Sequence, residues 1–363
     1  PAPDRIECSK GRIVQMTTSR IYNVNIAKQY PLPTPQEILE ELPLTFVETD
    51  TIYRFRKEIE NIILRKDSRI LVIAGPCSID SIPAALEYAS ALKKLQQKVS
   101  SKMVLIMRAY FEKPRTTLGW KGLVYDPDLD SSFNIEKGLR LSRKLLLELV
   151  RMELPAATEF LDPIMPQYFA DLITWAAIGA RTVESQTHRQ LASGLSMPVG
   201  FKNATDGSIN VAIDAIRTAL AKHSFLGIIN DGRTGVFSTK GNKFGHVVLR
   251  GGQHMPNYGS ENVAFAVELM KKLKLTPSII IDCSHANSMR NPLNQPKIFD
   301  DVVEQIRGGQ TAISGVMLES YIKTGRQDIT SKGKIIPGVS LTDPCLGWAE
   351  TEAAILKAYE NLP

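Results

Sequence analysis

The chain has 363 residues, of which 43% are hydrophobic and 23% are charged, a composition typical of an ordinary globular protein. Its net charge of +6 comes without a block of like charges or a recognisable nucleic-acid-binding module, so we expect small anionic substrates and no nucleic acid. No apolar run approaches the roughly 18 residues that a membrane helix needs, and the opening "PAPDRIECSKGR" lacks the apolar stretch of a signal peptide, so we expect a cytoplasmic protein without a membrane partner.

The first 65 residues differ in pattern from the rest of the chain. They contain a proline-punctuated connector, "QYPLPTPQEILEELP", followed by "TIYRFRKEIENIILRK", whose apolar spacing predicts an amphipathic helix. We therefore expect an N-terminal extension over residues 1–65 and a second domain over residues 66–363.

From residue 70 onward, short apolar runs alternate with helical patterns. The runs are "RILVIAGP", "MVLIMRAYF", "AATEFL", "ARTVES", "PVGFKN", "FLGIIN", "HVVLRGG", "SIIIDCSH" and "AISGVMLES". Strands buried on both faces and followed by helices indicate a parallel sheet, and about eight such units favour an α/β (β/α)8 barrel, the TIM barrel, over an open sheet. One run is then in surplus. Either "FLGIIN", "HVVLRGG" or the segment between them is expected to be an inserted β hairpin, near residues 228–247.

Polar side chains stand where the predicted strands end. They are Cys77, Arg108, Glu159, Arg181, Lys202, Arg250, His285 and Glu319. Any one of them alone would more often be a solvated rim residue. Eight at one level of a barrel are costly without a ligand to compensate them, and the carboxyl ends of barrel strands are where TIM-barrel active sites lie.

The cations among these residues, with neighbours in the loop that follows the second strand, predict anion binding. They are Arg108, Lys113, Arg115, Arg181, Lys202 and Arg250. Guanidinium and ammonium groups hold phosphates and carboxylates. One phosphate rarely needs six cations, so we expect two anionic substrates, or one substrate with several anionic groups.

A second set combines a thiol, an imidazole and two carboxylates. Its members are Cys77, His285, Glu319 and, beyond the last strand, Asp343 in "TDPCLGW". Taken singly, Cys77 would be a buried small residue and His285 a hydrogen-bonded structural histidine. Together they form a mixed soft and hard donor set, which suits Mn, Fe, Co or Zn and is poorly suited to Mg or Ca.

Several long strings carry a family resemblance. They are "GPCSI", "RAYFEKPRTTLGWKGL", "GARTVESQTHRQLASGLSMPVGFKN", "LRGG", "DCSHANS" and "TDPCLGW". In order, over about residues 35–360, they resemble the type I 3-deoxy-D-arabino-heptulosonate 7-phosphate (DAHP) synthases, which open the shikimate pathway. The resemblance implies a (β/α)8 barrel with a regulatory or oligomerising N-terminal extension and an inserted hairpin, assembled as a homodimer or homotetramer. It also implies the condensation of phosphoenolpyruvate with erythrose 4-phosphate, which gives DAHP and phosphate.

The resemblance assigns roles residue by residue. One divalent metal, Mn, Co, Fe or Zn, would be held by Cys77, His285, Glu319 and Asp343. Phosphoenolpyruvate would be bound by Arg108, Lys113, Arg181, Lys202 and Arg250. Arg115 and Thr116 would bind the phosphate of erythrose 4-phosphate, with Pro114 keeping the two groups apart. The catalytic residues would be Lys113, Lys202, Glu159 and His246, and which of the last three activates the attacking water stays open.

The chain departs from the family pattern where aromatic amino acids inhibit many members. Residues 16–19 read "MTTS" where the family often has acidic residues, Pro163 replaces a flexible side chain, and Asn230 with Asp231 replace a lysine and an aromatic or histidine residue. We therefore expect an active synthase with weakened or absent feedback. A milder interpretation is adaptation to another effector, with Gly227 favouring tyrosine.

Two other functions stay open from the sequence. One is a related synthase that joins phosphoenolpyruvate to another sugar phosphate, against which the "KPRTT" string argues. The other is a catalytically inactive regulatory paralogue, against which the four intact metal positions argue.

Overall fold

The computed structural model describes residues 22–253, 255–329 and 335–363. The chain divides into two compact units, Pro1–Pro33 and Thr34–Pro363. In the first unit, the described residues 22–33 form no helix or strand and contain a turn closed by a hydrogen bond from Ile26 N to Asn23 O at 3.0 Å.

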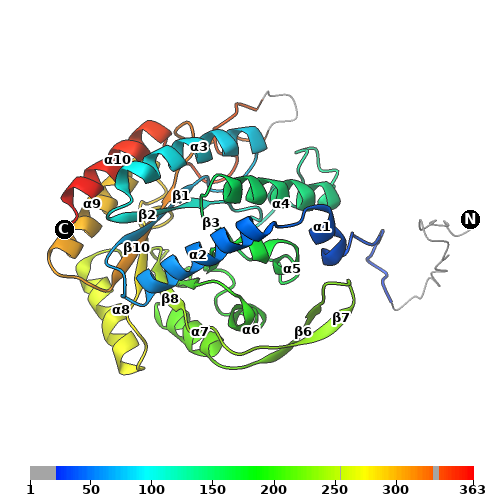
Figure 1. The fold of residues 1–363 in the computed structure, drawn as a ribbon, viewed down its shortest axis with the longest axis horizontal. Coiled ribbons are helices and arrows are strands. Elements are labelled where there is room, and N and C mark those ends of the chain that lie inside the picture. Colours follow the sequence, from blue (N-terminus) through cyan, green and yellow to red (C-terminus); the bar gives the residue numbers. More distant parts are fainter. Residues whose placement is uncertain (1–21, 254, 330–334) are drawn as a thin grey trace, which may run out of the picture. The chain divides into compact units, whose positions relative to one another are not determined.

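The centre of the second unit is a closed barrel of parallel strands in the order β1-β10-β9-β8-β5-β4-β3-β2 (Figure 1). Their bounds are β1 Ile70–Gly75, β2 Met103–Arg108, β3 Ala156–Glu159, β4 Trp175–Ile178, β5 Val199–Lys202, β8 Gly245–Leu249, β9 Ile279–Asp282 and β10 Ile313–Glu319. Seven of these eight strands are buried throughout, as the continuous apolar runs predict. The predicted (β/α)8 barrel is confirmed.

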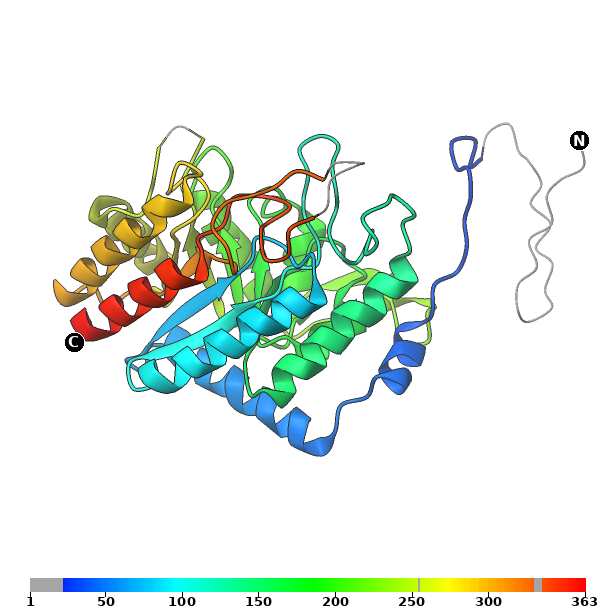
Figure 2. The same ribbon diagram turned by 90° about the horizontal axis from the view of Figure 1, so that it is seen from above.

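Helices cover the outside of the barrel, one or more after each strand (Figures 1 and 2). Their bounds are α3 Ile82–Val99, α4 Ile135–Arg151, α5 Pro166–Phe169, η1 Ala170–Leu172, α6 Gln186–Gly194, α7 Asn210–Leu220, α8 Ser260–Lys272, η2 Pro292–Asn294, α9 Gln295–Arg307 and α10 Trp348–Asn361. Within the described residues, none of the helices is long and apolar enough to cross a membrane.

The surplus strand run belongs to an inserted hairpin, as expected. Strands β6 (Ser224–Ile228) and β7 (Thr234–Ser238) pair antiparallel between α7 and β8, and the rings of Phe225 and Phe237 stack with centroids 5.6 Å apart. The bounds 228–247 expected from the sequence were wrong at both ends. The hairpin begins at Ser224, and residues 245–247 belong to barrel strand β8, where the side chains of His246 and Val247 are buried.

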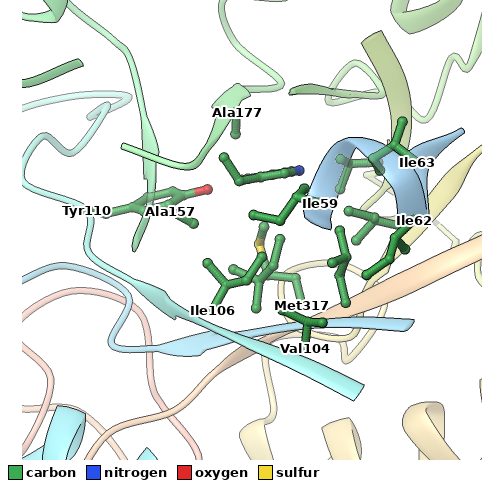
Figure 3. Packing of buried hydrophobic residues seen from close by; sticks show 14 residues of the cluster. Ile59, Ile62, Ile63, Val104, Ile106, Tyr110, Ala157, Ala177 and Met317 are labelled. Atoms are coloured by element: carbon green, nitrogen blue, oxygen red, sulfur yellow. The ribbon is translucent and has the colours of Figure 1, made fainter. Parts of the chain in front are cut away.

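Helices α1 (Pro35–Glu41) and α2 (Phe46–Ile63) each begin with a capping box, formed by Thr34 with Glu37 and by Thr45 with Glu48. Helix α2 closes one end of the barrel. Its apolar face contributes three isoleucines to the interior cluster shown in Figure 3, namely Ile59, Ile62 and Ile63.

The end that α2 closes is the one where strands begin. Arg65, just beyond α2, donates to the carbonyl of Ile313, the first residue of β10, at 3.0 Å. The guanidinium of Arg56 also donates to the carbonyls of Ala170 and Ile173, at 2.7 and 2.8 Å. Residues 34–65 are therefore part of the same compact unit as the barrel, and the predicted boundary at residue 65 does not coincide with the boundary of that unit. The regulatory role of the extension stays a prediction.

Candidate functional site

The strand-end residues expected from the sequence lie at the open end of the barrel. Arg108, Glu159, Lys202 and Glu319 are the last residues of β2, β3, β5 and β10, and Arg250 directly follows β8. The remaining three follow their strands by two or three residues and are Cys77, Arg181 and His285. Because all eight strands are parallel, these side chains share one end of the barrel.

Arg108 is the most fully embedded cation of this end. Its guanidinium is 1% exposed and donates to Glu319 Oε1 at 2.9 Å and to the carbonyl of Cys77 at 3.1 Å. The strand register brings these groups together, since Gly75 of β1 lies opposite Glu319 of β10. A side chain at Gly75 would place its Cβ 2.4 Å from the carbonyl oxygen of Arg108, so only glycine allows this approach.

The four predicted metal ligands lie close together. Donor atoms of Cys77, Glu319 and Asp343 are all within 4.8 Å of one another, and His285 Nε2 lies 3.5 Å from Glu319 Oε1. A thiol and two carboxylates gathered in this way, with an imidazole nitrogen beside one of the carboxylates, have the chemistry to hold a divalent transition metal or zinc.

Burial and neighbouring charges set the ionisation of two of these donors. Burial, reinforced by Glu319, raises the pKa of the Cys77 thiol to about 11, a penalty that a bound metal would reverse by binding the thiolate. Burial opposes ionisation of Asp343, but the Lys113 ammonium, 3.0 Å from Asp343 Oδ2, outweighs it and lowers the pKa of Asp343 below its ordinary value.

Lys113 points inward, next to the metal donors. Its ammonium contacts Cys77 Sγ as well as Asp343, and the loop after β2 therefore lies against the loop after β10 (Figure 2). The backbone of the β2 loop is closed by a hydrogen bond from Lys113 N to Lys121 O at 2.9 Å. Glycines at φ +147° and +106°, Gly119 and Gly122, allow its turns. A cation thus reaches the metal donors from the loop in which the sequence predicted it.

Two buried residues of the site were not predicted from the sequence. The ring of Tyr110 lies beneath the cations, with its centroid 3.5 Å from the Arg108 guanidinium and 5.9 Å from Lys202 Nζ. Asp282, the last residue of β9, is fully buried, with Oδ2 3.3 Å from Lys202 Nζ. The signal for Asp282 was its charge at the end of the apolar run "SIIID"; the signal for Tyr110 was an aromatic two residues past Arg108.

The outer cations form a second tier at the rim. Arg181 Nη2 donates to Thr116 Oγ1 at 3.2 Å, which joins the loop after β4 to the loop after β2. Burial lowers the pKa of Arg250, the Asp282 carboxylate opposes this, and the positive charges of Arg181 and Arg290 lower the pKa further, so several positive groups gather around Arg250. Such a concentration favours an anionic ligand. Arg290 was not predicted from the sequence.

Arg115 turns away from this tier. The residue is exposed, and its guanidinium lies over Gly119 of the same loop, where a Cβ would come within 2.6 Å of it. Lys113 and Arg115 therefore point to different surroundings on either side of Pro114. The structure places Arg115 on the exposed part of the β2 loop and not in the buried part of the site.

The candidates for activating water are separated by the fold. Glu159 is 7% exposed at the end of β3, and its Oε1 packs so closely on Gly179 that a Cβ there would lie 2.1 Å away. His246 does not belong to the site. It is the second residue of β8, at the opposite end of that strand from Arg250, where Trp175 donates to its Nε2 at 3.0 Å. Burial lowers the pKa of His246 to about 4 and keeps it neutral.

A separate cavity of about 670 Å³ lies in the region where the sequence departs from the family pattern. Residues from α1, α2, α5, η1, α6 and the hairpin line it, and Asn230 is among them. Pro163 is exposed, and Asp231 pairs with Arg233, with Oδ2 2.8 Å from Arg233 Nε. The "MTTS" string at 16–19 lies outside the described residues.

Comparisons with known proteins agree with this geometry. The sequence model of the DAHP synthetase I family matches residues 45–356. The chain is 48% identical over 348 residues, 96% of this chain and 98% of the relative, to the Tyr-sensitive phospho-2-dehydro-3-deoxyheptonate aldolase of Escherichia coli. It is 44% identical over 339 residues, 93% of this chain and 97% of the relative, to the Trp-sensitive enzyme of Salmonella typhimurium. A solved phospho-2-dehydro-3-deoxyheptonate aldolase from Francisella tularensis matches with a TM-score of 0.91 at 49% identity, covering 93% of this chain and 98% of that one.

Proposed function

The chain belongs to the DAHP synthetase I family, and from that premise we propose that it is a DAHP synthase whose reaction takes place at the open end of the barrel. The substrates are phosphoenolpyruvate and erythrose 4-phosphate, and the products are DAHP and inorganic phosphate. The observation that carries this proposal is the convergence of buried cations on a thiol, imidazole and carboxylate cluster. The two relatives described above are both named phospho-2-dehydro-3-deoxyheptonate aldolases, a name that supports this function and neither of the two alternatives.

Phosphoenolpyruvate binds among the buried cations. It carries a carboxylate and a phosphate on three carbons, so several positive groups must converge to hold it. Arg108 and Lys202 both lie against the ring of Tyr110, while Arg181 and Arg250 lie farther out, at the rim of the site. Lys113 reaches from the loop after β2 to the same place. These cations also stabilise the phosphate as it leaves.

Cys77, His285, Glu319 and Asp343 hold one divalent metal. When bound, the metal supplies Lewis-acid polarisation of the aldehyde of erythrose 4-phosphate. Arg115 and Thr116, on the exposed part of the β2 loop, bind the phosphate of that sugar. Lys202 is paired with Asp282 and serves as a proton donor or cation, which leaves the Glu159 carboxylate as the group that accepts a proton from the attacking water.

Release of inorganic phosphate from phosphoenolpyruvate tests the reaction. Purified protein with a divalent metal is expected to release phosphate only when erythrose 4-phosphate is added. Release with a five-carbon aldose phosphate instead would identify the related synthase. No release with any sugar phosphate would identify an inactive paralogue and contradict the proposal.

We also propose that feedback by aromatic amino acids is weak or absent, although the two relatives from Escherichia coli and Salmonella typhimurium are named Tyr-sensitive and Trp-sensitive. A zwitterionic effector needs a carboxylate for its ammonium group. Among the described residues that line the cavity, the one carboxylate is Asp171, and both of its oxygens already accept from Arg143 at 2.8 Å. Initial rates should change little with millimolar tyrosine, phenylalanine or tryptophan. Strong inhibition by any of them would refute the idea, and inhibition by tyrosine alone would support the milder interpretation based on Gly227.

The homodimer or homotetramer, the cytoplasmic location and the identity of the metal, Mn, Co, Fe or Zn, stay predictions. Size-exclusion chromatography with light scattering measures the first, and metal analysis of protein purified without added metal measures the last.

A further inference from the structure

We propose that Asp282 is a positioning residue that fixes the ring of His285 with Nε2 directed toward the metal donors. The residue is separate from the four proposed ligands and from the substrate cations. The inference rests on the proposed function in one respect, namely that His285 binds the metal.

The carboxylate of Asp282 is completely enclosed; its Oδ1 is hydrogen-bonded, while its Oδ2 makes close polar contacts without a hydrogen bond of good geometry. It is the last residue of β9 and has 0% exposure. Its Oδ1 accepts from Ser284 N at 3.0 Å and from Ser284 Oγ at 2.6 Å, and its Oδ2 lies 2.9 Å from His285 Nδ1. His285 has φ +51°, and this left-handed turn brings its ring back to the carboxylate three residues earlier.

These contacts determine which ring nitrogen carries the proton. Ser284 Oγ is 2.7 Å from His285 Nδ1, and its own proton is given to Asp282 Oδ1. The serine oxygen can therefore only accept from the ring, and a carboxylate oxygen can only accept as well. A proton on Nδ1 therefore completes the hydrogen bond to Ser284 Oγ, and the negative charge of Asp282 Oδ2, 2.9 Å away, favours the same tautomer. The lone pair of Nε2 is left for the metal, on the side of Glu319, 3.5 Å away.

Lys202 explains how a carboxylate can stay charged in this enclosed place. Its ammonium, 4% exposed, lies 3.3 Å from Asp282 Oδ2, and a buried anion needs such a partner. One carboxylate oxygen therefore contacts both a metal ligand and a substrate-binding lysine. Asp282 therefore sets the position of His285 relative to Lys202. Through these two residues it also sets the position of the metal site relative to the substrate site.

The variant Asp282→Asn tests the inference through metal binding in the absence of substrates. An amide of the same shape places a donor against either Ser284 or His285, whichever way it lies. We expect the dissociation constant for Mn²⁺, measured by calorimetric titration of the metal-free protein, to rise about 10- to 100-fold. The matched control is Glu48→Gln. Like Asp282, Glu48 is a buried carboxylate with a positively charged partner, in this case Arg151, but it lies on helix α2, away from the site. The control should bind Mn²⁺ as the wild type does, and wild-type affinity in Asp282→Asn would overturn the inference.

A second measurement needs no altered carboxylate. In wild-type protein loaded with Zn²⁺ and labelled with ¹⁵N-histidine, the His285 signal, assigned by its loss in His285→Asn, should show a proton on Nδ1 and none on Nε2. A proton on Nε2 would overturn the inference. Phosphate release by the same wild-type protein separates the role of Asp282 from the proposed function. Activity together with a proton on Nε2 would refute the role of Asp282, whereas no activity would refute the proposed function.

Discussion

Glu112 offers the sharpest test of the electrostatics next to the site. Its carboxyl is 2% exposed and accepts from the backbone N–H groups of Leu161 and Asp162 at 3.2 and 3.0 Å, with the Tyr125 hydroxyl 3.3 Å away. It therefore fastens the loop that carries Lys113 to the loop after β3. Burial, with the nearby negative charge of Asp162, raises the pKa of Glu112 from 4.5 to about 8.

The raised pKa has a definite effect on stability. Between pH 4.5 and about 8 the folded state holds a proton on Glu112 that the unfolded state has lost. The free energy of unfolding therefore falls as the pH rises through this interval, by about 1.4 kcal/mol per pH unit. From about pH 5.5 to about pH 7.5 the loss is on the order of 3 kcal/mol. The variant Glu112→Gln keeps the shape of the protonated acid but has no proton to lose.

Urea unfolding at one fixed protein concentration measures the effect. The wild type should lose about 3 kcal/mol relative to Glu112→Gln between these two pH values. The control is Glu48→Gln. Burial opposes ionisation of Glu48 in the wild type, but hydrogen bonds from Thr45 and Arg151 outweigh it and lower the pKa of Glu48, so this carboxylate is ionised in the folded and the unfolded state over the same pH range. The difference between wild type and that control should stay constant. Parallel curves for the wild type and Glu112→Gln would refute the reasoning.

Three further predictions concern the site, a corrected residue and the core. Arg115→Ala should raise the Michaelis constant for erythrose 4-phosphate far more than that for phosphoenolpyruvate, and equal effects in steady-state kinetics would contradict the division of the loop at Pro114. His246→Gln should keep kcat/KM within about twofold, since the ring lies at the opposite end of β8 from the site. Burial lowers the pKa of His246 to about 4, so the free energy of unfolding of the wild type should fall by up to about 3 kcal/mol relative to the variant as the pH falls from 6.5 to 4. Urea unfolding at each pH measures this difference. Ile62→Ala should cost about 3 kcal/mol in urea unfolding, and a loss below about 1 kcal/mol would mean that α2 does not support the barrel core.

The barrel could be predicted because its strands are buried on both faces and leave continuous apolar runs. The hairpin could be predicted only as a surplus run, since nothing local distinguishes strand β6 from a barrel strand such as β8. The same uncertainty about strand bounds placed His246 at the wrong end. The apolar face of α2 could be recognised in the sequence. That three of its isoleucines pack into the interior cluster of the barrel could not be predicted.

The site shows the same division. The proposed ligands Cys77 and Asp343 are 266 residues apart, with Sγ and Oδ2 3.6 Å from each other, and the family resemblance linked them where sequence spacing could not. Asp282 was overlooked because its role depends on its partners. Lys202 lies on another strand and His285 in a turn, so only the folded chain shows that they meet the Asp282 carboxylate. Arg290 and Tyr110 were missed for a related reason, because only the closed barrel shows that they face the cations.

The most direct test of the whole account is a metal titration of the metal-free enzyme, followed by phosphate release from phosphoenolpyruvate and erythrose 4-phosphate. If Cys77, His285, Glu319 and Asp343 form one metal site in a DAHP synthase, chelated protein releases no phosphate, and added Mn²⁺ restores the rate to a plateau at one ion per chain. Full activity in the chelated protein, or a rate that shows no plateau near one ion per chain, would contradict the account.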